Sequence, residues 1–245
     1  NLGERIAAFG AWRRELADAV RRYGQWLNDS GLAEPAMQAR IERLLERLRE
    51  DRISIAFVAE FSRGKSELIN SIFFAEYGQR VLPSSAGRTT MCPTELMYDP
   101  ALPASVRLLP IETRTGDASV AELRARRDAW HEIPVVPGDV DSVTSAFAAV
   151  RDTLRVPVEE AVALGLFDAD DDDSPIKPDA MGEVEIPRWR HAIANIPDPL
   201  LEMGLVVIDT PGLNAIGNEP ELTLNLIPSA DAVLFVLAAD AGVTR

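Results

Sequence analysis

The chain has 245 residues, 47% of them hydrophobic and 26% charged, which is an ordinary globular balance for one large or two modest domains. Its net charge of −14 argues against nonspecific nucleic-acid binding and against direct adhesion of this chain to anionic lipid. The single cysteine, Cys92, excludes an internal disulfide and fits a reducing cytosol. No apolar run reaches the roughly 18 residues of a membrane span. The chain begins at Asn1 rather than methionine, so we expect a piece of something longer.

The N-terminal 50 residues carry two apolar stripes with helical spacing. Residues 28–31 (Asn-Asp-Ser-Gly) end the first helix, and Pro35 suits the first turn of the second. We therefore expect a helical hairpin over residues 1–50, whose exposed seam is covered by other helices or another copy. The alternative is an arm packed on the following domain. The stripes are Leu2, Ile6, Phe9, Trp12, Leu16, Val20, Tyr23 and Leu27, then Met37, Ile41, Leu44 and Leu48.

The most informative segment is ISIAFVAEFSRGKSELIN, residues 53–70. Residues 53–58 form a short β-branched run that predicts a buried strand, and residues 67–74 have helical spacing. The eight residues from 59 to 66 fit the phosphate-loop pattern G-x-x-x-x-G-K-[ST] except at the first glycine. The expected nucleotide-binding residues of this loop are Ala59, Glu60, Phe61, Ser62, Arg63, Gly64, Lys65 and Ser66.

A strand, a loop and a helix in this order create a polyphosphate site. The loop N–H groups and the positive end of the helix surround the phosphates. Lys65 is expected to meet the outer phosphates, and the Ser66 hydroxyl to hold Mg²⁺. Ala59 departs from the pattern, because the first loop position often needs a conformation that glycine adopts cheaply.

A polar, glycine-containing segment follows at residues 84–93, before a possible strand at 94–98. Switch-type nucleotide hydrolases place a mobile threonine in such a segment, and the candidates are Thr89 and Thr90.

Residues 99–190 carry weaker patterns, which predict a strand at 105–113 and helices at 120–130 and 140–154. The acidic run at 167–174 lacks the glycine and closing glutamate of a calcium loop, which favours a solvated loop. Lys177-Pro178-Asp179 lacks the context of a guanine-recognition motif, and His131 and His191 show no metal or catalytic setting.

Near the C-terminus, the apolar strand at residues 205–208 leads directly into Asp209-Thr210-Pro211-Gly212. Asp209 can bind Mg²⁺ through water, and the Gly212 N–H can meet a γ-phosphate. Strands are also expected at 191–196 and 232–237, the second of them buried.

Four segments together resemble bacterial dynamin-like large GTPases: AEFSRGKSELIN, GRTTMCPTEL, IPDPLLEMGLVVIDTPGL and SADAVLFVLAAD. The resemblance implies an α/β fold, a P-loop GTPase-type, mostly parallel sheet with flanking helices, preceded by a neck-like helical hairpin at 1–50. Residues 51–245 are expected to form the GTPase domain, incomplete at its C-terminal end, with an insertion at about 99–190.

The resemblance also implies roles for individual residues. Ser62 matches a loop serine near the bridging oxygen and a monovalent cation, and Arg63 is a surface residue rather than a catalytic arginine. The spacing G-x-x-T-x-x-P selects Thr90 over Thr89. Phe61 stands where related proteins have a glutamine that helps to orient water. The implied catalytic residues are Ser62, Lys65 and Thr90, and the implied Mg²⁺ ligands are Ser66, Thr90 and Asp209.

The implied activity is Mg²⁺-dependent binding and hydrolysis of GTP, coupled to dimerisation of GTPase domains and to membrane remodelling. GTP or GDP and Mg²⁺ are the expected cofactors, with a monovalent cation as a further candidate. We expect a cytoplasmic protein. Peripheral contact with the inner membrane, through regions outside this chain, is an open alternative. No nucleic-acid partner is expected. Ala59 and Phe61 favour the competing hypothesis, a nucleotide-gated scaffold with negligible turnover.

Overall fold

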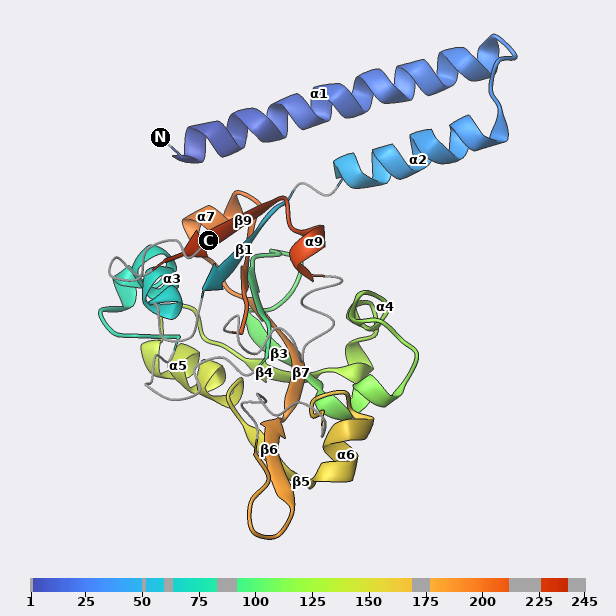
Figure 1. Cartoon of the computed structure of the whole chain (residues 1–245). Helices are drawn as coiled ribbons and strands as arrows, with labels where there is room; N and C mark the ends of the chain where they lie inside the picture. Colours follow the sequence, from blue (N-terminus) through green and yellow to red (C-terminus); the bar gives the residue numbers. More distant parts are fainter. Residues whose placement is uncertain are drawn as a thin grey trace. The chain divides into compact units, whose positions relative to one another are not determined.

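The structure is a computed structural model, and it describes residues 2–49, 52–59, 64–82, 92–168, 177–211 and 226–237. The chain divides into two compact units, Asn1–Ile53 and Ser54–Arg245 (Figure 1). In the described part of the chain, no helix is both long and apolar enough to cross a bilayer.

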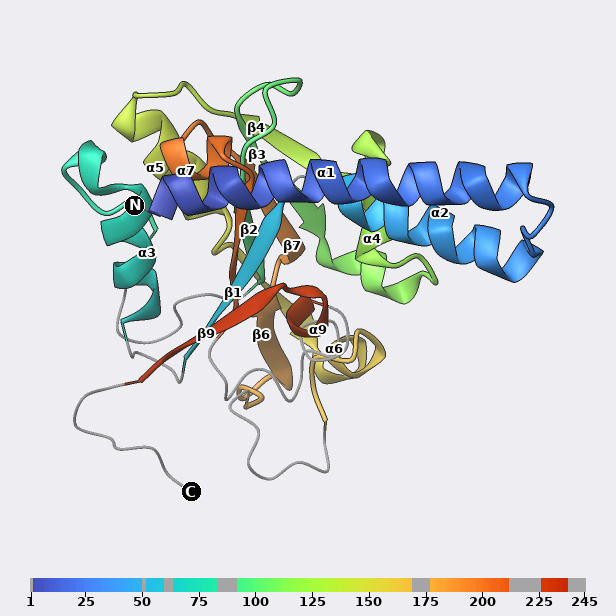
Figure 2. The same cartoon turned by 90° about the horizontal axis from the view of Figure 1, so that it is seen from above.

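The N-terminal unit is a helical hairpin, as the apolar spacing predicts. Helix α1 covers Leu2–Asp29 and helix α2 covers Pro35–Arg49, and they run side by side in opposite directions (Figures 1 and 2). The chain turns at Gly31, whose φ of 67° lies in the left-handed region that favours glycine. Gly24 of α1 faces the Ile41 side chain of α2, and a Cβ at residue 24 would lie in ordinary contact with it, at 3.4 Å.

Only part of the apolar stripe of α1 is buried in this hairpin. Leu27 is buried, whereas Trp12 and Trp26 keep 54% and 55% of their surface exposed. Each tryptophan packs against a neighbouring ring of the same helix, Phe9 in one case and Tyr23 in the other. One partner helix is too narrow to cover a stripe of this width, so an aromatic flank stays in contact with solvent.

The second unit is built on a seven-stranded sheet with the order β4-β3-β7-β2-β8-β1-β9. The pairs β1–β9 and β2–β7 are parallel, whereas β2–β8, β3–β7 and β3–β4 are antiparallel. The expected α/β fold is confirmed, and its sheet is mixed in direction. The strands are β1 (Ile53–Ala59), β2 (Thr94–Met97), β3 (Ser105–Pro110), β4 (His131–Pro134), β7 (Trp189–Asn195), β8 (Leu205–Asp209) and β9 (Ala232–Val236).

Helices flank both faces of this sheet (Figure 2). Val206 and Ile208 of β8 point the same way, because they are two residues apart in a strand. Val206 packs in a cluster with Leu123 of α4, and Ile208 packs with Ile227 of α9. One side carries α4 (Val120–Arg124) and α9 (Ile227–Ser229), and the other carries α3 (Lys65–Phe73), α5 (Val140–Ala149) and α7 (Pro199–Glu202).

The helix expected over residues 120–130 is shorter than predicted and stops at Arg124. A capping box starts it, but a short 3₁₀ turn replaces its continuation. Trp130 folds back over this end, and its indole N–H donates to the Leu123 carbonyl at 2.8 Å. Trp130, the last residue of the expected helix, therefore contacts the end of α4 with its side chain instead of extending the helix.

The helix expected over residues 140–154 ends at Ala149, because the following chain pairs with a strand distant in sequence. Strands β5 (Thr153–Pro157) and β6 (Glu183–Pro187) form an antiparallel ribbon that projects with α6 (Val158–Ala163) from the main sheet (Figure 1). Tertiary pairing therefore overrides the local pattern here. The buried core of this lobe consists of Ile111, Val156, Ala161, Leu164, Leu166, Val184 and Ile186.

The acidic run begins at a packed residue, since Phe167 lies against the core of this lobe. Residues 169–176 lie outside the described residues, so the solvated loop stays a prediction. The Asp179 carboxylate accepts the N–H groups of Met181 and Glu183 at 2.8 and 3.0 Å. The Lys-Pro-Asp sequence is thus part of a turn, which agrees with its rejection as a guanine-recognition motif.

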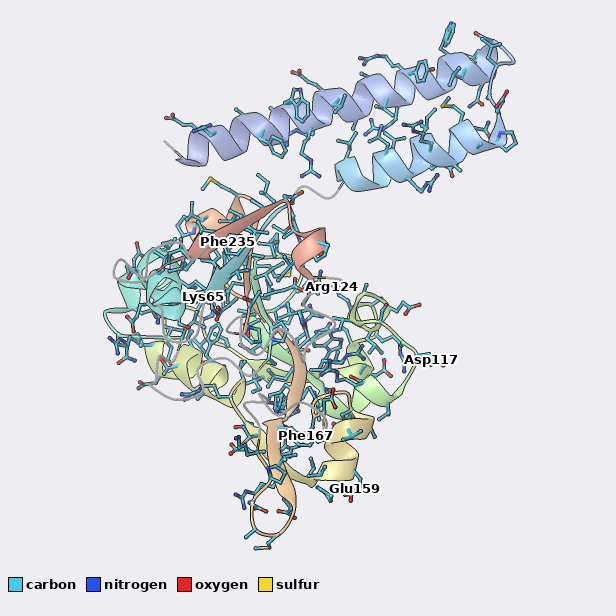
Figure 3. The ribbon with its side chains drawn as sticks, in the orientation of Figure 1. Lys65, Asp117, Arg124, Glu159, Phe167 and Phe235 are labelled. Carbon is cyan, nitrogen blue, oxygen red and sulfur yellow. The ribbon has the colours of Figure 1, made fainter. Side chains whose placement is uncertain are left out.

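The strand expected at 232–237 forms as β9 at Ala232–Val236, but the prediction that it is buried is wrong. Phe235 keeps 62% of its surface exposed, and its neighbours in β9 are exposed or half-buried (Figure 3). The reason is position, because β9 is the last strand in the order and, among the described residues, β1 is the only strand that borders it. The Asp231 carboxylate fixes the start of β9 by accepting the N–H and hydroxyl of Ser54 at 2.8 and 3.0 Å.

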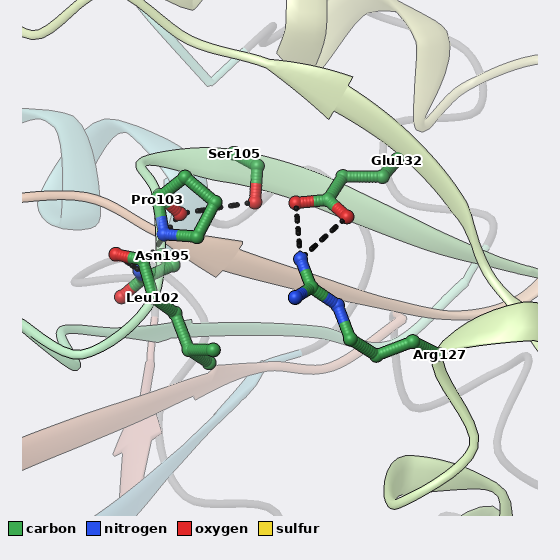
Figure 4. A network of polar contacts seen from close by, with 6 residues as sticks. All are labelled: Leu102, Pro103, Ser105, Arg127, Glu132 and Asn195. Carbon is green, nitrogen blue, oxygen red and sulfur yellow. Dashed lines mark hydrogen bonds and ion pairs between the residues drawn. The ribbon is translucent and has the colours of Figure 1, made fainter.

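Polar contacts fix the opposite end of the sheet (Figure 4). The Asn195 amide, at the end of β7, donates to the carbonyls of Leu102 and Pro103 at 3.1 and 3.0 Å. Arg127 donates to both carboxylate oxygens of Glu132 in β4, the shorter contact being 3.0 Å. The Asn195 side chain of β7 therefore holds the connection between β2 and β3.

Two buried residues, Glu95 of β2 and His191 of β7, form a cluster with the exposed Arg124 of α4. The Nε2 atom of His191 lies 2.8 Å from one oxygen of Glu95, and Arg124 pairs with the other. Burial raises the pKa of Glu95, but the hydrogen bond and charge of His191 and the charge of Arg124 outweigh it and lower this pKa to about 2. His191, expected to stand alone, is thus the partner of a buried carboxylate.

We predict that Glu95→Gln destabilises the fold at neutral pH and that this difference shrinks in acid. The pKa of Glu95 in the fold is lowered from 4.5 to about 2, so its stabilising effect is present above pH 4.5 and is lost as the pH falls toward 2. The shift corresponds to a free energy on the order of 3 kcal/mol. Urea unfolding at several pH values measures the difference.

The exposed Glu159 of α6 provides the control (Figure 3). Glu159→Gln is expected to change the free energy of unfolding little at any pH. A Glu95→Gln difference that stays constant from pH 7 to pH 3 would contradict the ionised cluster.

Candidate functional site

The site begins where β1 ends. Ala59 is the last residue of β1 and pairs with Val236, so its backbone belongs to an extended strand. The glycine missing from this position is therefore not needed for a left-handed conformation. Gly64 is different, because its φ of 83° is left-handed, while an added Cβ would meet no atom within 4 Å. Glycine is required at residue 64 by backbone conformation rather than by space.

Helix α3 starts directly after this glycine. Gly64 is the N-cap and its carbonyl accepts the Leu68 N–H at 2.9 Å, the first bond of the helix. The N–H groups of the first helical turn have no partner within the helix and carry the positive end of its dipole. Lys65 and Ser66 occupy this turn and are both buried. The arrangement is suited to an anion with several oxygen atoms.

Lys65 connects α3 with the end of β8 (Figure 3). Its Nζ donates to the carboxylate of Asp209 and to the carbonyl of Thr210. Lys65 and Asp209 are both buried, and they are 144 positions apart in the chain. The fold thus brings together the two sequence motifs that were expected to form one site.

Strand β2 borders the site from the other side. Its first residue, Thr94, pairs with Asp209 in the antiparallel ladder between β2 and β8. Thr90 itself lies outside the described residues.

The structure describes Ala59, Gly64, Lys65, Ser66 and Asp209 of the predicted site residues. Lys65 and Asp209 are in contact, and Ser66 follows Lys65 in the first turn of α3. The remaining predicted residues stay predictions. Those outside the described residues are Glu60, Phe61, Ser62, Arg63, Thr90 and Gly212, together with Thr89 and Gly87.

Two buried polar residues on or next to the elements that carry the site, Thr210 and Asn70, were not predicted. The Thr210 hydroxyl donates to the Phe57 carbonyl of β1 at 2.7 Å. The Asn70 side chain accepts the N–H groups of Val81 and Leu82 at 3.1 and 2.8 Å. A polar residue inside an apolar helical stripe, or directly after an apolar strand, is the signal that could have identified them.

The donor set fits a nucleotide polyphosphate with Mg²⁺. A lysine and free helical N–H groups suit phosphate oxygens, and a serine hydroxyl with one carboxylate suits Mg²⁺. Among the described residues, no three His, Cys, Asp or Glu side chains gather as a metal-binding group. This agrees with the chemistry of Mg²⁺, which proteins usually hold through one or two carboxylates together with phosphates and water.

The model of the dynamin family matches residues 55–245, which includes every site residue named above. The chain belongs to the dynamin family. Members of this family are GTPases, which bind GTP or GDP with Mg²⁺. No curated protein matches the chain.

This dynamin-family chain is also similar to two solved structures of an oligomerised bacterial dynamin pair, described as a mechanism for long-range sensing and tethering of membranes. The first is 14% identical, with 94% of this chain and 28% of that chain covered and a TM-score of 0.42. The second is 12% identical, with 92% and 33% covered and a TM-score of 0.38. The chain therefore spans a third or less of the length of these proteins.

We predict that Lys65→Ala abolishes nucleotide binding, because it removes the charge expected to face the outer phosphates. The chain offers a matched control in its other lysine, Lys177, which is exposed. Lys177→Ala is expected to bind normally. Titration with a fluorescent GTP analogue measures both, and circular dichroism confirms that each variant is folded. Unchanged affinity in Lys65→Ala would rule out this phosphate site.

Proposed function

We propose that this protein binds and hydrolyses GTP in a Mg²⁺-dependent reaction, and that the reaction is coupled to dimerisation of its GTPase domains and to membrane remodelling. One observation carries the proposal: Lys65, at the start of α3, meets Asp209, at the end of β8, in a buried position beside the left-handed Gly64. The two motifs needed for phosphate and Mg²⁺ are thus joined in one place.

The residues of the chain act mainly by position and charge. Lys65 and the N–H groups at the start of α3 bind the outer phosphates. Ser66, Thr90 and Asp209 hold Mg²⁺, with Asp209 acting through water. When bound, Mg²⁺ neutralises charge that develops on the phosphate oxygens. The Gly212 N–H orients the γ-phosphate.

Ser62 has a separate role in this proposal, near the bridging oxygen and a monovalent cation. It completes the loop whose expected members run from Ala59 to Ser66. The bond that breaks is the β–γ phosphoanhydride of GTP, with water as the nucleophile. Catalysis requires no covalent intermediate with the protein.

The competing candidate is a nucleotide-gated scaffold with little hydrolysis, which rests on Ala59 and Phe61. The support from Ala59 is weakened. Ala59 lies in the extended strand β1, so it introduces no left-handed backbone strain into the loop. Phe61 lies outside the described residues. GTP turnover at saturating substrate, measured with and without liposomes, separates the two candidates, because a scaffold binds GTP without releasing phosphate.

Partners and location belong to the same proposal. We propose self-association through GTPase domains in a cytoplasmic protein, and membrane contact through regions outside these 245 residues. Phosphate release that rises more steeply than protein concentration supports dimerisation. Strict proportionality to protein concentration would count against it.

The choice of Thr90 over Thr89 leads to a further prediction. Thr90→Ala is expected to leave GTP binding within a few-fold and to lower turnover strongly, because a switch threonine acts on Mg²⁺ and the attacking water in the transition state. Thr89→Ala is the adjacent control and is expected to do much less. A larger loss of turnover in Thr89→Ala would overturn the assignment.

Another prediction concerns the base. Guanine is recognised in such proteins by [NT]-K-x-D, and the sequence contains no such motif after Asp209. We expect a polypeptide of these 245 residues to discriminate poorly between GTP and ATP and to turn over slowly, since no residue pairs with the base edge. Competition of ATP against labelled GTP measures this. Strong guanine preference would mean that other residues of this chain recognise the base.

A further inference from the structure

Thr210 is a fully buried polar residue with no role in the proposed function so far. It follows directly after the last residue of β8 and has no exposed surface. Its hydroxyl donates to the Phe57 carbonyl of β1 at 2.7 Å. A buried hydroxyl group is costly unless it is hydrogen-bonded, so this contact determines which way the side chain points.

The contact joins two neighbouring strands of the sheet. β1 and β8 are neighbours in the sheet, and β8 stops at Asp209, one residue before Thr210. The hydroxyl therefore adds a bond between the two strands one residue beyond the end of β8. Phe57 lies two residues before the end of β1, which leads into the phosphate loop.

Thr210 also contacts the site through its main chain. Its carbonyl accepts Lys65 Nζ, which donates to Asp209 as well. One residue thus touches both halves of the site: β1 through its hydroxyl, and the first turn of α3 through its carbonyl. Asp209 is the residue directly before Thr210 and also accepts Lys65 Nζ, so both contacts of Thr210 act next to its backbone.

We propose that Thr210 is a positioning residue, which holds the Asp209 carboxylate at a fixed place relative to Lys65 and Ser66. The inference rests on the proposed function, because it concerns the distance between Asp209 and the residues proposed to bind phosphate. Mg²⁺ demands near-octahedral geometry, so small displacements of one ligand matter. A displacement of about 1 Å can lower a rate by about 100-fold.

A purely structural role makes a different prediction. If the hydroxyl only satisfies the buried Phe57 carbonyl, its removal lowers stability and leaves the Mg²⁺ dependence of the folded protein unchanged. If Thr210 positions Asp209, its removal raises the Mg²⁺ concentration needed for half-maximal turnover. The two roles are therefore separated by a Mg²⁺ titration rather than by stability.

The test compares Thr210→Val, which keeps the shape and removes the hydroxyl, with Thr210→Ser, which keeps the hydroxyl. Thr144→Val is a matched control, because the Thr144 hydroxyl is buried in α5 without a hydrogen-bond partner. GTP turnover by the native protein is measured at saturating GTP across Mg²⁺ concentrations. Urea unfolding reports the folded fraction, and Thr210→Ala at low temperature replaces Thr210→Val if that variant does not fold.

We expect Thr210→Val to lower kcat about tenfold or more and to raise the half-maximal Mg²⁺ concentration several-fold, with KM for GTP changed little. Thr210→Ser is expected to restore both values to within about threefold, and Thr144→Val to match the unsubstituted protein. An unchanged Mg²⁺ dependence in folded Thr210→Val or Thr210→Ala overturns the inference while leaving the proposed function intact. Absence of GTP binding in the unsubstituted protein overturns both.

Discussion

A lysine ammonium group cannot be buried without partners that accept its hydrogen bonds, and the phosphate site of this protein is organised by that constraint. Lys65 satisfies it with a carboxylate and a carbonyl that arrive 144 and 145 positions later in the chain. For these groups to meet, β1 and β8 must be neighbours in the sheet, as its strand order shows, and both must end on the same side. The left-handed Gly64 then turns the chain so that Lys65 opens the helix.

Apolar contacts and polar contacts have different tasks in the second unit. Apolar clusters, such as that of Ala56, Val58 and Ile208, stabilise the packing of the strands and helices but specify their exact positions only weakly. Buried polar groups specify position, because an unmet hydrogen bond is costly. Asn70 holds the chain at Val81 and Leu82 against α3. Asn195 does the same for the connection between β2 and β3.

The parts of the fold that could be predicted from sequence are those whose signals are local. The strand ending at Ala59, the helix after Gly64 and the strand ending at Asp209 each carry their own apolar pattern and a motif. The predictions that were wrong concern residues whose structure depends on strands that are distant in the sequence. The residues of β9 have the composition of a buried strand, yet their exposure follows from their place at the end of the sheet order. The first two residues of β5, Thr153 and Leu154, were included in the expected helix at 140–154, and the strand as a whole was not predicted, because its partner, β6, is 26 residues away in sequence at the closest.

The same reasoning applies to the candidate site. Lys65 and Asp209 were predicted because their types and spacing belong to motifs. Thr210 lies inside the Asp209 motif but received no predicted role, because no sequence pattern shows that its hydroxyl donates to a carbonyl 153 positions earlier. His191 was likewise judged to be isolated, because its carboxylate partner, Glu95, lies on another strand 96 positions away.

The exposed aromatic flank of α1 gives the molecule two optical populations. The chain has four tryptophans: Trp12 and Trp26 face solvent on the hairpin, whereas Trp130 and Trp189 are buried in the other unit. Emission from the first pair is expected at longer wavelengths and open to quenching by dissolved iodide, and emission from the second pair is shielded. Any helix or surface that covers the flank therefore changes the red edge of the spectrum and leaves the signal of the nucleotide-binding unit unaltered, so that the two units carry separate intrinsic reporters.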